Sequence, residues 1–94
     1  MRIGILIFRT HALLRMSQRG IAPQDVREAL EQGEVIEDYP DDRPYPSCLV
    51  LGRCGSRSLH IVIADNREDG ETVVITVYEP DNGKWHPDFR RRKP

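Results

Sequence analysis

Two side chains that can carry acid–base chemistry, His60 and Tyr78, lie in the two most β-prone segments of the chain. These segments, 59–64 and 72–79, are rich in β-branched residues. The polar loop between them contains Gly70, and this arrangement predicts an antiparallel hairpin. An imidazole with a pKa near ~6.5 can give or take a proton at neutral pH. A phenol can position or protonate an anionic oxygen.

The alternation of side chains along strands predicts which residues of the hairpin share a face. Burying the apolar residues of both strands together predicts three cross-strand pairs: Leu59 with Val77, Ile61 with Ile75, and Ile63 with Val73. His60 and Tyr78 then project together from the opposite, semi-polar face. We expect the helices to leave that face uncovered, and we look for function there.

A first helix is predicted at residues 11–18, with Thr10 as its N-cap and Gly20 as its stop. Its predicted buried side chains are Ala12, Leu13 and Met16. A second stripe carries cationic or titratable groups at positions i, i+4 and i+8: His11, Arg15 and Arg19.

A second helix is predicted at residues 21–33, with Pro23 at its first turn and Gly33 as its stop. Its predicted packed side chains are Val26, Ala29 and Leu30. A short strand at 3–8 precedes the helices. The order of elements predicts an α+β domain in which two N-terminal helices pack on one face of an antiparallel sheet of about four strands.

The composition fits one domain spanning residues 1–94, in which residues 90–94 form a basic tail. Net charge is −1, but the charges are segregated: both ends are basic and residues 21–46 are acidic. No apolar run reaches the ~18 residues of a membrane span. Cys48 and Cys54 lack metal-ligand spacing, so we expect reduced thiols, no metal, no cofactor and a cytoplasmic protein.

Several short motifs together resemble a bacterial family known as domain of unknown function 4258. The motifs are His11-Ala12, Arg15-Met16, Arg19-Gly20-Ile21, Asp25-Val26, Gly33-Glu34, Leu59-His60, Thr76-Val77-Tyr78 with Pro80, and Trp85. The family looks like a relative of the RelE and MqsR toxins, small ribonucleases of type II toxin–antitoxin systems. The resemblance implies two helices against a curved sheet, and a cognate antitoxin as partner, of the zinc-finger type in some systems.

The resemblance also implies cleavage of messenger RNA, either on the ribosome or off it. Metal-independent cleavage needs a base for the 2′-hydroxyl, an acid for the leaving 5′-oxygen and a cation at the phosphate. His60 fits the acid or base and Tyr78 the proton donor or positioning group, while Arg15, Arg19 or His11 fits the phosphate. The remaining predicted RNA contacts are Lys84, Trp85 and Arg90.

Each candidate also has a purely structural interpretation. His60 between apolar neighbours fits a packed, hydrogen-bonded histidine, and Trp85 fits packing as well as base stacking. Arginines on a helix are usually solvated or paired, and His11 also fits a helix start. The alternative function is therefore a non-catalytic protein- or RNA-binding module of the same fold.

Overall fold

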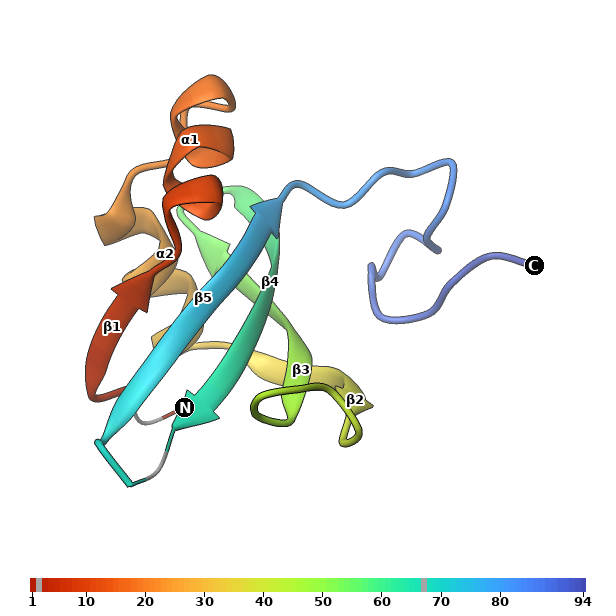
Figure 1. Cartoon of the computed structure of the whole chain (residues 1–94). Coiled ribbons are helices and arrows are strands. Elements are labelled where there is room, and N and C mark those ends of the chain that lie inside the picture. The colour runs from red at the N-terminus through yellow and green to blue at the C-terminus, as the bar shows by residue number, and fades with distance from the viewer. Residues whose placement is uncertain (2, 67) are drawn as a thin grey trace.

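A computed structural model describes residues 1, 3–66 and 68–94, and its centre is a five-stranded sheet (Figure 1). The helices are α1 (Thr10–Gln18) and α2 (Pro23–Glu31). The strands are β1 (Ile5–Phe8), β2 (Glu34–Tyr39), β3 (Ser47–Cys54), β4 (Arg57–Asn66) and β5 (Glu71–Tyr78). The predicted α+β class is confirmed.

The sheet has the strand order β1-β5-β4-β3-β2. Strands β2 to β5 form an antiparallel meander, which corresponds to the predicted antiparallel sheet of about four strands. Strand β1 adds a fifth strand, and it pairs with β5 in parallel, with Ile7 opposite Val73. The sheet is thus mostly antiparallel, and β1 and β2 form its edges.

Both helices pack against the same side of the sheet and enclose one apolar core. Val26, Ala29 and Leu30 of α2 are buried as predicted, and they share this core with Leu59 and Ile61 of β4. Helix α2 lies very close to β3, because a Cβ added at Gly52 would stand 2.1 Å from the Ala29 carbonyl oxygen. Glycine at position 52 therefore sets the spacing of helix and sheet.

Two predictions for α1 are wrong. Thr10 is the first residue of the helix and not its cap, since Arg9 occupies the N-cap position and no side chain caps the helix. Leu13 is 43% exposed, whereas Ala12 and Met16 are buried. Helix α1 has only nine residues and packs on the sheet along the narrow stripe of Ala12 and Met16. Leu13, the position after Ala12, therefore remains in solvent. Gly20 does follow the helix, with φ of 67°.

The predicted register of the hairpin is also wrong, although the predicted faces near its open end are right. Ile61 lies opposite Val77, and His60 opposite Tyr78, two positions away from the expected pairing. A shift of two residues keeps every side chain on its own face. A β-bulge next to Val62 and Ile63 then places Val74 opposite Ile63, so Val74 is buried in the core instead of Val73 and Ile75.

The segment after β5 runs out beside the sheet (Figure 1), and we call residues 81–94 the C-terminal strap. Its Trp85 and Phe89 contact His60 of β4. It folds on itself through a bridge between Trp85 and Arg92. Arg90 forms an ion pair with Glu34, and Arg92 with Glu37, both on β2. The predicted basic tail, residues 90–94, is therefore part of this strap.

Neither helix among the described residues combines the length and the apolar content that crossing a membrane would require.

Candidate functional site

His60 and Tyr78 form a cross-strand pair on the sheet face that the helices leave uncovered. The His60 Nδ1 atom lies 3.3 Å from the Tyr78 hydroxyl, and Nε2 lies 2.8 Å from the carbonyl oxygen of Phe89. The helices do not bury this face, but the strap does: the Trp85 ring stands edge-on to the imidazole at 4.4 Å. His60 is consequently 0% exposed.

The partners of His60 decide where its proton resides. A carbonyl oxygen can only accept, so Nε2 donates to Phe89 and carries the proton. Burial lowers the pKa of His60, which keeps the ring neutral at pH 7. In the neutral ring Nδ1 is an acceptor, and the Tyr78 hydroxyl donates to it. A proton that leaves or enters Nδ1 must therefore pass through the Tyr78 oxygen.

The lowered pKa of His60 predicts that the protein loses stability in mild acid. The unfolded chain takes up the proton near pH ~6.5, whereas the folded chain takes it up only at lower pH, so acid favours unfolding. We expect the free energy of unfolding to fall below pH 6.5 by at most ~1.4 kcal/mol per pH unit. Urea titrations at pH 7.5 and 5.5 measure this loss.

The control for this pH dependence is a variant that lacks the imidazole of His60. The Glu37 carboxylate favours the charged ring and Arg92 opposes it, but both keep their charge between pH 7.5 and 5.5. His60→Asn should therefore be less stable than the parent protein at pH 7.5 and show a flatter pH dependence. Equal pH dependence of both proteins would remove His60 as the cause.

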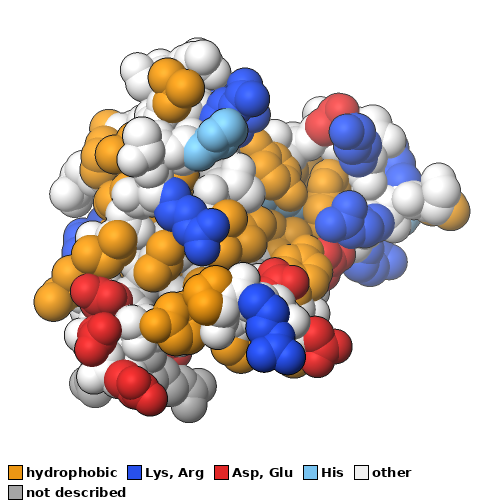
Figure 2. Space-filling model, viewed as in Figure 1, with side chains coloured by type: hydrophobic (Ala, Val, Ile, Leu, Met, Phe, Trp, Pro, Cys, Tyr) orange, Lys and Arg blue, Asp and Glu red, His pale blue; other side chains and the backbone are white. Residues whose placement is uncertain are grey.

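Tyr78 and Glu79 lie at the centre of a surface groove formed by two adjoining hollows. Arg19 lines the first hollow, and Asp81, Lys84, Trp85 and Arg92 line the second. We call this feature the phenol groove. Figure 2 shows basic side chains over α1 and over the strap, with hydrophobic side chains between them. Tyr78 thus shares its two hollows with the basic side chains Arg19, Lys84 and Arg92 and with the acidic Glu79 and Asp81.

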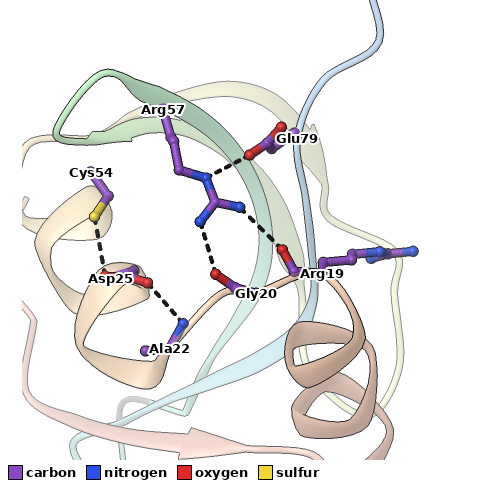
Figure 3. Close-up of polar contacts among 7 residues, drawn as sticks. All are labelled: Arg19, Gly20, Ala22, Asp25, Cys54, Arg57 and Glu79. Atoms are coloured by element: carbon purple, nitrogen blue, oxygen red, sulfur yellow. Dashed lines mark hydrogen bonds and ion pairs between the residues drawn. The ribbon is translucent and has the colours of Figure 1, made fainter.

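Arg19 is held in place through its side chain and through its backbone carbonyl, and Figure 3 shows the carbonyl contact with Arg57. The Arg19 Nη1 donates to the Val77 carbonyl oxygen at 2.6 Å, beside Tyr78. Its own carbonyl accepts from Arg57 Nη2 at 3.3 Å, and Arg57 Nη1 reaches the Gly20 carbonyl at 2.9 Å. The Nε of Arg57 pairs with Glu79 at 2.5 Å. Arg57 therefore joins the C-terminal end of α1 to the rim of the groove.

Arg57→Ala should loosen this end of the groove. We expect a loss of about 1 to 2 kcal/mol in unfolding free energy, because two carbonyls and one carboxylate lose a charged donor at a partly exposed site. Urea titration measures it. The matched control is Arg27→Ala, which removes one exposed contact with the Gly4 carbonyl and should cost less. Equal losses in the two variants would contradict a special role for Arg57.

Of the other predicted site residues, some line the phenol groove and others lie outside it. His11 and Arg15 are exposed on α1, outside the described lining of the phenol groove. Lys84 lines the groove, whereas Trp85 is only 3% exposed and packs on His60. Arg90 lies in a separate hollow beside Glu34 and Asp88.

Four groups at the site are not predicted from the sequence: Arg57, Arg92, Glu37 and the Phe89 carbonyl. Nothing local marks them, because each becomes important through a partner that lies far away in the sequence. Charge segregation was the one available signal, since the acidic β2 is complementary to the basic end of the chain.

Among the residues that the structure describes, the cysteines and possible metal ligands form no second centre. Hydrogen bonds to Glu28 and Asp25 raise the pKa of Cys54 to about 12, so this thiol is protonated at neutral pH. In the described parts of the chain, three or more His, Cys, Asp or Glu side chains do not come together as a metal site.

The chain matches the model of a protein family. A family model described as "Domain of unknown function (DUF4258)" matches residues 8–79, about three quarters of the chain, and the match ends where the strap begins. No curated protein and no solved structure matches the sequence.

Proposed function

Starting from the fact that the chain belongs to the DUF4258 family, whose description names no activity, we propose that it is a toxin-like, metal-independent endoribonuclease. The observation that carries the proposal is the Tyr78 hydroxyl, which is backed by the neutral His60 and shares a groove with Arg19. The chain would act in the cytoplasm as the toxin of a type II toxin–antitoxin pair.

His60 and Tyr78 together can accept the proton that the 2′-hydroxyl of RNA loses during cleavage. The 2′-oxygen attacks the adjacent phosphorus, and its proton passes to the Tyr78 oxygen while the Tyr78 proton passes to His60 Nδ1. The bond from phosphorus to the 5′-oxygen breaks, and water supplies the proton for that leaving group. The products are a 2′,3′-cyclic phosphate and a 5′-hydroxyl end.

Arg19 is suited to the charge that gathers on the phosphate. The contact with Val77 uses Nη1, and a guanidinium carries five donors in a fork that fits phosphate oxygens. Lys84 and Arg92 supply positive charge on the other side of Tyr78. His11 and Arg15 belong to the same proposal as phosphate contacts along α1.

The proposed partners are RNA and an antitoxin protein, of the zinc-finger type in some systems. A net charge of −1 disfavours strong binding to RNA alone, because phosphate contacts dominate such affinity. We therefore favour RNA that the ribosome presents to the groove.

The test is expression in a bacterial host, with and without the adjacent gene, followed by analysis of RNA ends. We expect growth arrest, new RNA fragments with 5′-hydroxyl ends, and relief of both by His60→Ala or Tyr78→Phe. If the two variants arrest growth as strongly as the parent protein, neither residue belongs to the mechanism.

One observation favours a second candidate, a non-catalytic module that binds protein or RNA. His60 is fully buried and both ring nitrogens have partners within the chain, which is typical of a structural histidine. This candidate predicts neither arrest nor cleavage, and specific capture of one partner that Arg19→Ala weakens.

A further inference from the structure

The C-terminal strap covers half of the pair on which the proposed function rests. Its Phe89 carbonyl accepts from His60 Nε2 at 2.8 Å, and its Trp85 ring packs against the imidazole. A ligand in the phenol groove can approach Tyr78, which is half-buried, but it cannot touch His60 while the strap is in place.

Two exposed ion pairs fasten the strap to strand β2. Arg92 approaches Glu37 with two donors, Nε at 2.8 Å and Nη2 at 3.1 Å, and Arg90 pairs with Glu34. The arginine side chains are 58% and 53% exposed. Exposed pairs of this kind contribute little and weaken as salt concentration rises.

The same two arginines are suited to bind a polyanion. The two-donor fork that Arg92 offers to the Glu37 carboxylate also fits two oxygens of a phosphate. Arg92 moreover lies over the Trp85 ring at 4.6 Å, so a ligand that draws Arg92 away also removes a contact of that ring.

The backbone of the strap carries strain at the contact with His60. Phe89 has a φ of 58°, in the left-handed region that aromatic residues avoid. The strained residue is the one whose carbonyl reaches His60, so lifting the strap would allow this backbone to relax.

We propose that the strap is a latch that RNA releases: Arg90 and Arg92 exchange Glu34 and Glu37 for backbone phosphates, and the strap then lifts away from His60. The inference rests on the proposed function, because it takes RNA as the ligand. The latch would couple binding of the RNA backbone to exposure of the acid–base pair.

Trp85, the one tryptophan of the chain, reports directly on the strap. Quenching of its fluorescence by acrylamide should be weak in the parent protein at low salt and should increase with potassium chloride. In the double variant Glu34→Gln/Glu37→Gln we expect the quenching constant at low salt to be about two- to fivefold higher. Asp88→Asn is the matched control, since Asp88 pairs with Arg91 inside the strap, and it should resemble the parent protein.

RNA release is tested with a 2′-O-methylated oligonucleotide, which lacks the 2′-hydroxyl and cannot be cleaved. Its addition should raise the quenching constant of the parent protein toward that of the double variant. Three results would overturn the latch: equal quenching in the parent protein and the double variant, no binding of the oligonucleotide at low salt, or binding without increased quenching. If the oligonucleotide opens the strap but the protein does not cleave ordinary RNA, the result would support the latch and contradict the proposed nuclease activity.

Discussion

Tyr78→Phe is expected to lower the rate of RNA cleavage by at least about 100-fold, the scale of one proton-transfer group. The ring remains, so the contact with His60 in the edge-on arrangement at 5.3 Å persists. What disappears is the oxygen through which a proton reaches Nδ1. The measurement is the initial rate on an RNA oligonucleotide, in the presence of ribosomes if they are required.

The same substitution should have little effect on the fold. His60 loses the donor to Nδ1, and a lost hydrogen bond of this kind costs about 1 kcal/mol. Tyr45→Phe is the control, because Tyr45 is 40% exposed in the loop before β3. It should leave the cleavage rate unchanged. A Tyr78→Phe rate within twofold of the parent rate would remove the hydroxyl from the chemistry.

Local patterns were sufficient to predict most of the domain. The buried face of α2 follows from apolar spacing, and the meander from β2 to β5 follows from short β-prone segments separated by turns. The placement of His60 beside Tyr78 on one face also follows, because alternation is a property of the strand itself.

The errors arise where a distant contact decides the outcome. A β-bulge changes which valine of β5 is buried, and no residue near Val74 signals it. Strand β1 pairs in parallel with β5, although the two strands lie far apart in the sequence. No local pattern encodes this pairing.

The strap is the largest of these differences for the candidate site. The basic run that contains Arg92 has the composition of a solvated tail, and only the fold brings Arg92 to Glu37, 55 positions away. The strap contacts bury His60, which the sequence predicts to project from an uncovered face of the sheet. The burial of His60 could not be predicted without that pairing.

Trp85→Ala is expected to lower the free energy of unfolding by about 3 kcal/mol. The side chain is 3% exposed, stands edge-on to His60 and carries Arg92 on its ring. Because the variant has no tryptophan, urea titration should follow the loss by circular dichroism. Trp85→Phe keeps an aromatic ring and should lose clearly less, whereas a loss below about 1 kcal/mol for Trp85→Ala would show that the strap contributes little to the fold.

The same variant should change the titration of His60. Burial is the main cause of the lowered pKa, and Trp85 supplies part of that burial, so its removal should raise the pKa of His60 toward the ordinary value near ~6.5. The ring proton resonances of His60 in an NMR titration measure this shift. An unchanged pKa would mean that the sheet and Tyr78 alone desolvate the imidazole. A raised pKa would make the strap the element that desolvates His60 in the resting protein.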